Sequence, residues 1–385
     1  MFCFHRSGQG APSNWRAPAT TIGSSPHLLA TIYRPPAEQP PPTGALEIAV
    51  IEATLGKLAA GEDLSSEETC AAIEAVMQGR CTEGEIALLL TGLRLKGETV
   101  QEVAGAAQAM RRQMTPIRTE RTGIVDTCGT GGDGSKTFNI STAAALVTAA
   151  AGVPVAKHGN RRATSLTGSA DVLAELGVNV DADVATVEAC LDELGVCFCF
   201  APLLHASMKH VADVRRKLDF PTIFNMLGPL TNPAGAPYQV IGVARDELRP
   251  LLAQSLTLLG TGRALIVHGD GGLDEVSLSG PTQVTEACGE TCLEFEWTPE
   301  TFQLPESSLK ALVVKGPAES AAMITSILAG QRGAPRDITV INAAAALWTA
   351  GARQMPAACA RLAEEALDSG AARDLLAHLV ERSRA

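Results

Sequence analysis

A glycine-rich segment between a predicted strand and a predicted helix constrains this chain most. It runs from Asp126 to Thr142 and reads D-T-C-G-T-G-G-D-G-S-K-T-F-N-I-S-T. The apolar residues before it predict a strand over 123–127, and the alanine-rich run after it predicts a helix over 141–151. Successive glycines let backbone N–H groups approach an anion, and the start of a helix adds partial positive charge. The segment therefore predicts a phosphate-binding loop.

Two familiar phosphate-loop patterns do not fit this segment. Three of its glycines satisfy the G-x-G-x-x-G spacing of dinucleotide sites, but such a site needs an acidic residue after the next strand. Lys157 and His158 stand there instead, and basic side chains suit phosphate better than ribose hydroxyls. A Walker A motif also fails, because Ser135 intrudes before Lys136 and breaks its spacing.

Two further polar segments follow later strands. Residues 157–171 read K-H-G-N-R-R-A-T-S-L-T-G-S-A-D, which supplies cations, hydroxyls and a second helix start. Two such loops in adjacent positions predict a ligand with more than one phosphate. Asp274 and Glu275 follow the strand that ends at His268. Mg²⁺ takes carboxylates together with phosphate oxygens and water, so beside a polyphosphate this acid pair predicts a magnesium site.

The chain divides into three parts by pattern. Residues 1–44 hold 8 of the 22 prolines and one acidic residue, so we expect a disordered extension or a transit peptide, and the proline density favours the first. Residues 45–115 predict a small helical domain, whose helices begin at three capping boxes (Ser65 with Glu68, Thr82 with Glu85, Thr99 with Glu102).

From residue 116 to 385, short apolar runs alternate with helical stretches, and this alternation predicts an α/β domain with a mostly parallel sheet. Ligands of such sheets bind at the carboxyl ends of the strands, where the polar segments lie. The predicted strands are 123–127, 153–156, 177–180, 196–200, 239–243 and 264–268.

Composition argues against several classes of function. A net charge of −11 and an aromatic content of 4% are atypical of a protein that binds nucleic acid. The longest apolar run, 143–156, is too short to cross a bilayer. The 10 cysteines show no pair of closely spaced ligand pairs, so we interpret them as small buried hydrophobic residues in a reducing compartment.

A fourth polar stretch completes the pattern. It covers residues 200–216 and continues into 222–233, which read T-I-F-N-M-L-G-P-L-T-N-P. Its Arg215 is a candidate for holding a substrate carboxylate, although a surface ion pair is an equally good interpretation of the motif alone. Together the four stretches closely resemble the anthranilate phosphoribosyltransferases, over roughly residues 46–375 and in the order in which that family has them.

The resemblance implies a reaction, partners and a fold. The reaction is transfer of the 5-phosphoribosyl group from phosphoribosyl pyrophosphate to the amine of anthranilate, with release of pyrophosphate, in tryptophan biosynthesis. It implies Mg²⁺ as cofactor, a homodimer formed through the helical domain, and a nucleoside phosphorylase-like phosphoribosyltransferase architecture. It also implies that a segment near 210–235 returns to the helical domain. We expect a cytoplasmic enzyme, or an organellar one if residues 1–44 are a transit peptide, with no nucleic-acid or membrane partner.

The resemblance also assigns site residues, and no general base is expected among them. Magnesium would be served by Ser141, Asp274 and Glu275. Anthranilate would contact Gly129, Asn160 and Arg215, with His158, Pro202, His205 and Met208 lining its approach. Phosphoribosyl pyrophosphate would be held by Gly129, Gly132, Asp133, Thr137, Asn139, Ile140, Ser141, Thr142, Lys157, His158, Gly159, Asn160, Arg161, Arg162, Ala163, Thr164, Ser165 and Ser169.

Two departures from the family pattern bear on the acceptor and the second loop. Leu166 stands where many relatives have a lysine, and Arg162 is a candidate to replace that charge. Ala206 stands where relatives have a proline, and losing that proline would loosen one wall of the acceptor channel.

Two other functions remain to be weighed. A pyrimidine nucleoside phosphorylase would have a different second loop, and a non-catalytic nucleic-acid-binding relative would need a broad basic face.

Overall fold

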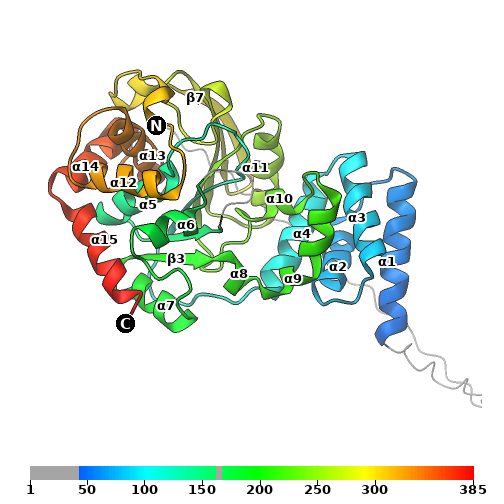
Figure 1. Cartoon of the computed structure of the whole chain (residues 1–385). Helices are drawn as coiled ribbons and strands as arrows, with labels where there is room; N and C mark the ends of the chain where they lie inside the picture. The colour runs from blue at the N-terminus through cyan, green and yellow to red at the C-terminus, as the bar shows by residue number, and fades with distance from the viewer. Residues whose placement is uncertain (1–42, 162–166) are drawn as a thin grey trace, which may run out of the picture. The chain divides into compact units, whose positions relative to one another are not determined.

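A seven-stranded sheet organises the larger part of the chain (Figure 1) in the computed structural model, which describes residues 43–161 and 167–385. The strand order is β3-β2-β1-β4-β5-β6-β7. The first five of these run parallel to one another, while the β5–β6 and β6–β7 pairs are antiparallel. The carboxyl ends of five strands therefore meet at one edge. The strands are β1 (Val125–Gly129), β2 (Val155–Gly159), β3 (Val196–Phe200), β4 (Tyr238–Gly242), β5 (Arg263–Gly269), β6 (Thr282–Cys288) and β7 (Thr291–Trp297).

Five of the six predicted strands are confirmed, and one prediction is wrong. Residues 177–180 alternate in polarity like a strand, but no strand forms there. Gly177 has a φ of +98° and ends the turn after α6, and Val178 and Val180 are buried without joining the sheet. The hairpin of β6 and β7 was not predicted. It carries Cys288, which is exposed, so the interpretation of the cysteines as buried fails at this position.

Helices cover both faces of the sheet. Along β5, Leu265 and Val267 enter one hydrophobic core, while Ala264 and Ile266 enter another, as the alternation of a strand requires. The second core is completed by α11 (Leu248–Leu258) and by the helices of the N-terminal part. The first core is covered by α5 (Ile140–Ala150), α6 (Ser169–Glu175), α7 (Val184–Leu194), α12 (Pro317–Leu328), α13 (Ala334–Thr349), α14 (Pro356–Asp368) and α15 (Ala371–Arg382).

The N-terminal part is helical. Its helices are α1 (Thr43–Ala59), α2 (Ser66–Met77), α3 (Glu83–Lys96) and α4 (Val100–Gln113), and all three predicted capping boxes are present. With the parallel sheet, this confirms the predicted fold class. Within the described residues, none of the helices combines the length and the apolar character needed to cross a membrane.

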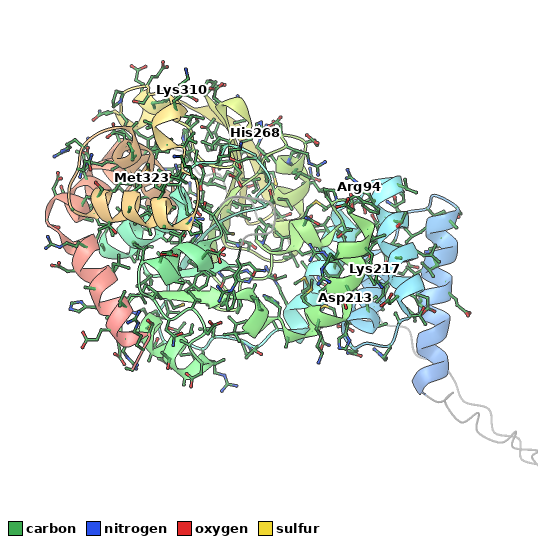
Figure 2. All side chains as sticks on the ribbon, in the orientation of Figure 1. Arg94, Asp213, Lys217, His268, Lys310 and Met323 are labelled. Carbon is green, nitrogen blue, oxygen red and sulfur yellow. The ribbon has the colours of Figure 1, made fainter. Side chains whose placement is uncertain are left out.

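A later segment of the chain joins these helices. Helix α8 (Ala201–Leu204) leads through a short turn into α9 (Lys209–Leu218), which contacts α2 and α3, and α10 (Phe224–Leu227) contacts α4 (Figure 1). Lys217, labelled on α9 in Figure 2, donates to Glu83 Oε2 of α3 over 2.5 Å. These are the contacts expected if a segment near 210–235 returns to the helical domain. The exact domain boundaries, 1–44, 45–115 and 116–385, stay a prediction. Of the predicted extension, residues 1–42 lie outside the described residues.

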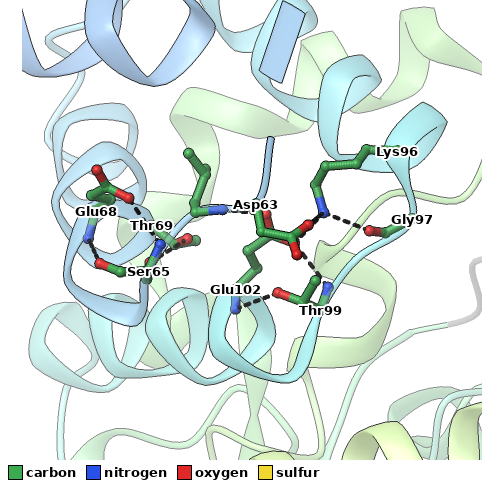
Figure 3. A network of polar contacts seen from close by, with 9 residues as sticks. Asp63, Ser65, Glu68, Thr69, Lys96, Gly97, Thr99 and Glu102 are labelled. Atoms are coloured by element: carbon green, nitrogen blue, oxygen red, sulfur yellow. Dashed lines mark hydrogen bonds and ion pairs between the residues drawn. The ribbon is translucent and has the colours of Figure 1, made fainter. Parts of the chain in front are cut away.

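A buried ion pair ties the helical part together (Figure 3). Glu102, the capping-box residue of α4, is fully buried and accepts from Lys96 Nζ at 3.0 Å. Its two oxygens also accept from the backbone N–H groups of Leu64 and Thr99, at 3.0 and 2.8 Å. Lys96 in turn reaches Asp63 at 2.7 Å. One carboxylate therefore fixes the ends of α2, α3 and α4 with respect to one another.

Candidate active site

Four neighbouring parallel strands end in glycine at the carboxyl edge of the sheet: Gly129, Gly159, Gly242 and Gly269. None of the four has room for a side chain. A Cβ on Gly129 would lie 2.7 Å from a carboxylate oxygen of Asp274, and one on Gly242 would overlap the backbone oxygen of the same residue. The loops that follow the strands can therefore cross directly over the ends of their neighbours.

These loops enclose a cavity of about 360 Å³. The cavity brings together the first glycine-rich loop, the second polar loop and the acid pair, as predicted for residues at one edge of a parallel sheet. Its lining includes, from the predicted set, Gly129, Asp133, Thr137, Asn139, Ile140, Ser141, Lys157, His158, Gly159, Asn160, Arg161, Ser169, Asp274 and Glu275.

The glycine-rich loop takes a backbone shape that its glycines make accessible. Gly131, Gly132 and Gly134 have positive φ angles, and Lys136 joins them with a φ of +58°. The loop then pairs with a segment far along the chain, because Phe138 N–H donates to the carbonyl of Leu312 at 2.8 Å. At its other end the loop is held by Thr130 N–H, which donates to the carbonyl of Gly242 at 2.9 Å, while its glycines between these contacts stay exposed.

Asn139 connects the two loops at the start of α5. Its Oδ1 accepts from the backbone N–H of Thr142 at 3.1 Å and so caps the helix, which begins at Ile140, one residue before the predicted start. Its Nδ2 donates to the carbonyl of Thr167 in the second loop at 3.2 Å. Its own N–H donates to Ser320 Oγ at 2.9 Å. One side chain therefore caps α5 and fixes both loops around the cavity.

A lysine places positive charge at the base of the cavity. Lys157 is 4% exposed, and its Nζ donates to the carbonyl of Thr127 at 2.5 Å and to Ser141 Oγ at 3.0 Å. Burial lowers the pKa of this ammonium, and the nearby Asp126 carboxyl opposes that shift. The charge is fixed in place by hydrogen bonds, so it is already oriented before a phosphate arrives.

The acid pair is half-buried and lines the same cavity as this lysine. Burial raises the pKa of Asp274 to about 7, and the neighbouring Asp133 carboxyl adds to the shift. Burial, followed by the charge of Asp274, also raises the pKa of Glu275 well above its usual range. Carboxyls held together in this way are stabilised by a cation.

The donor set fits Mg²⁺ with phosphate oxygens and water as further ligands. In the described part of the chain, no three histidine, cysteine or acidic side chains are grouped so as to bind a metal by themselves. A magnesium ion here would therefore depend on the substrate for part of its coordination.

Two histidines form a neutral pair beside the cavity. The Nε2 atoms of His158 and His205 lie 3.2 Å apart, and His158 Nδ1 lies 3.0 Å from the carbonyl oxygen of Gly228. Because that carbonyl can only accept, His158 carries its proton on Nδ1 and accepts from His205 at Nε2. Burial lowers the pKa of His158 to about 3 and that of His205 to about 4. The pair is thus uncharged at neutral pH.

Arg215 on α9 is held by α10. Its Nη2 donates to Asn225 Oδ1 at 3.3 Å, and its guanidinium lies 5.5 Å from the centre of the Phe224 ring. Burial lowers the pKa of this group, and no carboxylate of the described residues pairs with it. Arg216 is exposed and pairs with Asp213 at 3.1 Å. The surface ion pair considered for Arg215 therefore belongs to its neighbour.

Several predicted residues do not line this cavity. Gly132 and Thr142 belong to the first loop and to α5 but lie outside the lining, as do Arg215, Pro202, His205 and Met208 of the predicted acceptor group. His205 is joined to the cavity through His158, which does line it. Arg162, Ala163, Thr164 and Ser165, with the unusual Leu166, lie outside the described residues.

The sequence reasoning missed three residues that shape the site. Lys136 lines the cavity in a left-handed conformation, Ser320 supports Asn139, and Asn342 binds the backbone of Val276 next to the acid pair. Lys136 carried a signal, because it lies within the glycine-rich loop. Ser320 and Asn342 lie in helices without a distinctive motif, and only the fold brings them to the site.

Comparison with known proteins decides the family. Residues 53–114 match the helical bundle domain of a glycosyl transferase family, and residues 121–373 match its a/b domain. The anthranilate phosphoribosyltransferase of Pelotomaculum thermopropionicum is 49% identical over 332 residues, which cover 86% of this chain and 96% of that protein. The one from Rhodopirellula baltica is 49% identical over 321 residues, or 83% and 94% of the two chains. This chain belongs to the anthranilate phosphoribosyltransferase family.

Solved structures of the family agree with this assignment. The anthranilate phosphoribosyltransferase of Thermus thermophilus superposes with a TM-score of 0.82 at 43% identity, covering 86% of this chain and 99% of that one. The Saccharomyces cerevisiae enzyme, solved in complex with phosphoribosyl pyrophosphate and Mg, gives a TM-score of 0.79 at 30% identity over 87% and 98% of the two chains. The predicted family, its transferase activity and its nucleoside phosphorylase-like architecture are confirmed.

Proposed function

We propose that this chain transfers the 5-phosphoribosyl group of phosphoribosyl pyrophosphate to the amine of anthranilate, giving N-(5-phosphoribosyl)anthranilate and pyrophosphate, in tryptophan biosynthesis. The observation that carries the proposal is the cavity in which the glycine-rich loop, the second polar loop and a half-buried acid pair meet. A solved relative from Saccharomyces cerevisiae, in complex with phosphoribosyl pyrophosphate and Mg, supports the choice of donor. Another structure of that enzyme, with 4-fluoroanthranilate, supports the choice of acceptor.

The glycine-rich loop and the second loop bind the donor in this proposal. The N–H groups around Gly131 and Gly134, the start of α5 and the second loop surround the pyrophosphate. Breaking the bond at ribose C1 transfers negative charge to the leaving pyrophosphate, and fixed donors aimed at that charge lower the barrier. Lys157 adds a positive charge that needs no reorganisation, because Thr127 and Ser141 already hold it.

Ser141, Asp274 and Glu275 would hold Mg²⁺. When bound, Mg²⁺ supplies positive charge to the leaving pyrophosphate. The chain's own contribution is to hold Asp274 against Gly129 and Gly242, with Glu275 next to it and both acids half-buried, so that a cation is favoured there.

The residues that bind anthranilate in this proposal act by positioning it rather than by acid–base catalysis. The aniline nitrogen of anthranilate is a free base at neutral pH, so no catalytic base is assigned. Arg215 binds the carboxylate of anthranilate, and Asn160 orients its amine. Helix α10 supports this arrangement because Asn225 holds Arg215, and Gly228, directly after the helix, accepts from His158. The neutral histidine pair then gives an uncharged wall to the acceptor's aromatic ring.

We also propose a homodimer formed through the helical part. On α3, Leu88 and Leu95 are 62% and 82% exposed, which is unusual for leucines on one helix. They border a groove that Leu55 and Leu58 of α1 complete. A second copy covering this face would remove that apolar surface from water.

A cytoplasmic location accords with the cysteines of the described chain, all of which are free, including the exposed Cys288.

The test is the loss of anthranilate fluorescence in the presence of the purified chain. We expect loss only when phosphoribosyl pyrophosphate and Mg²⁺ are both present, with pyrophosphate released in equal amount. Fluorescence that stays constant under these conditions, or release of inorganic phosphate instead, would contradict the proposal.

Sedimentation of the wild type and of a Leu88→Ser, Leu95→Ser variant tests the dimer, which the variant should weaken.

A further inference from the structure

A buried asparagine binds the backbone next to the acid pair. Asn342, in α13, is 3% exposed. Its Oδ1 accepts from the backbone N–H of Val276 at 2.8 Å, and its Nδ2 donates to the carbonyl of Val276 at 2.9 Å. The second Nδ2 proton goes to the carbonyl of Ile338 in the same helix, also at 2.9 Å. The amide thus meets both polar groups of one residue and is itself held by its own helix.

At Val276, the amide of Asn342 makes the two backbone hydrogen bonds that a neighbouring strand would otherwise make. After β5 the chain passes over Gly269, where Gly269 N–H donates to the carbonyl of Leu273 at 2.8 Å. It then crosses Gly242, whose missing side chain leaves space for the backbone of Asp274. Glycines make space but supply no directional bond from a side chain. Asn342 supplies two such bonds, one residue after Glu275.

The loop needs such an anchor because removing two neighbouring carboxyls from water, even in part, is energetically unfavourable. Two adjacent carboxyls are half-buried together, and carboxyls leave low-dielectric surroundings for water unless something holds them. The Val276 backbone is itself buried, so losing the amide would leave an N–H and a carbonyl without partners. The side chain of Asn342 therefore keeps the loop against the sheet from the side of α13.

We propose that Asn342 is a positioning residue that fixes the carboxyls of Asp274 and Glu275 in the orientation that binds a divalent cation. This inference rests on the proposed role of the acid pair in holding Mg²⁺. It adds a residue of α13 to the machinery, 66 positions beyond the loop that it orients. Partners that orient metal ligands without touching the metal typically change affinity by roughly 10–100-fold when removed.

The test compares Asn342→Leu with a matched control. Leucine has the same number and branching of side-chain heavy atoms as asparagine but a larger volume, and it forms neither bond. Val340→Ala removes buried methyl groups from the same helix without touching the loop, and it controls for lost stability. Binding of Mn²⁺ in the presence of phosphoribosyl pyrophosphate is followed by electron paramagnetic resonance. Hydrogen exchange of the peptide containing Val276 is measured in parallel on the metal-free chain.

We expect Asn342→Leu to weaken Mn²⁺ binding by about tenfold and to speed exchange at Val276. Val340→Ala should leave both values close to those of the wild type. Wild-type Mn²⁺ affinity in Asn342→Leu, or an equal loss in Val340→Ala, would overturn the inference. A double variant, Asp274→Asn with Glu275→Gln, separates the two proposals. If it loses Mn²⁺ while Asn342→Leu retains it, only the positioning role fails. If it retains Mn²⁺, the metal site itself is wrong and the positioning role fails with it.

Discussion

The carboxylate of Asp274 occupies the space in which a side chain on Gly129 would begin, with Oδ2 only 2.7 Å from that point. The φ of Gly129 is not positive, so an alanine there meets no backbone strain, and Asp274 is the nearest group that its Cβ would meet. We expect Gly129→Ala to displace the acid and to reduce turnover by roughly a hundredfold, since a shift of about 1 Å at a reacting site has that effect. Steady-state kinetics at saturating substrates measure it.

Gly84→Ala is the control for this substitution. Gly84 lies in the first turn of α3, far from the cavity, and an added Cβ there makes only an ordinary contact with Thr82. It should keep full activity. If Gly129→Ala also stays fully active, Asp274 is either free to move or not needed.

The second prediction concerns the two acids themselves. Asp274→Asn with Glu275→Gln removes both negative charges and keeps the shapes of the side chains. We expect a large rise in the Mg²⁺ concentration needed for half-maximal rate, and partial recovery of turnover at saturating Mg²⁺, because these acids bind the ion in the proposed site. A Mg²⁺ dependence like that of the wild type would remove the pair from the metal site.

The third prediction is a pH dependence of Mg²⁺ binding. In the metal-free chain, burial and the Asp133 carboxyl raise the pKa of Asp274 to about 7, so below that pH the group is protonated. A carboxyl must lose its proton to bind a metal, so Mg²⁺ affinity should fall by about tenfold for each pH unit below 7 and level off above it if Asp274 alone titrates. Mg²⁺ titrations at about pH 6, 7 and 8 test this, and Asp274→Asn should show a shallower dependence.

The same shift has a consequence for stability. A carboxyl with a raised pKa binds a proton more tightly in the folded than in the unfolded chain. The contribution of Asp274 to the unfolding free energy of the metal-free protein should therefore decrease as pH rises from about 4 to 7, and Mg²⁺ should offset that decrease. The comparison with Asp274→Asn isolates this contribution, because other groups, such as His158 and His205, titrate with the opposite sign. The same slope of unfolding free energy against pH in wild type and in Asp274→Asn would contradict the assignment of the shift.

The fourth prediction concerns the stability of the helical part. Glu102→Ala would leave Lys96 almost buried and would strip two backbone N–H groups of their acceptor. Breaking a buried pair by removing one partner typically costs about 3–5 kcal/mol, which urea denaturation can measure. Lys57→Ala is the control, because Lys57 and Glu68 form a 2.6 Å pair that is about 40% exposed, and such pairs contribute at most about 1 kcal/mol. Equal losses in the two variants would show that burial is not the cause.

Local patterns were enough to predict most of the fold. The capping boxes at Ser65, Thr82 and Thr99 start helices because the bonds they make lie within one turn. Cys197 and Cys199 lie in the buried strand β3, as their alternation in an apolar run indicates. Residues 177–180 show the limit of this reasoning. Their alternation satisfies the strand pattern, but a strand needs a partner, and no local pattern says whether one is in place.

The site divides in the same way. The loops could be predicted because glycines, hydroxyls and cations occur together in the sequence, and the parallel sheet brings them to one edge. The contact of His158 with His205 and the support of Val276 by Asn342 could not, because these pairs lie 47 and 66 residues apart and only the complete fold brings them together. A single buried asparagine in an alanine-rich helix has no local feature that marks its partner.

The last prediction concerns Arg215→Ala. If its guanidinium binds the carboxylate of anthranilate, removing it loses charge-assisted hydrogen bonds worth roughly 1.5–3 kcal/mol, which corresponds to about tenfold to a hundredfold in kcat/KM for anthranilate. The kinetics for phosphoribosyl pyrophosphate should change little, because in the proposed site its phosphates contact other loops. Asn225 holds the side chain from α10, so the loss reflects a fixed group rather than a mobile one.

Arg216→Ala is the matched control, since Arg216 is exposed and pairs with Asp213. Aniline, which lacks the carboxylate, sharpens the test. The wild type should prefer anthranilate strongly, and Arg215→Ala should lose most of that preference because the discriminating group no longer has a partner. Two outcomes would remove Arg215 from the acceptor site: equal behaviour of the two variants, or a collapse of phosphoribosyl pyrophosphate affinity in Arg215→Ala. The second would place the guanidinium against a phosphate and would make the second loop, rather than α9, the place to look for the group that recognises anthranilate.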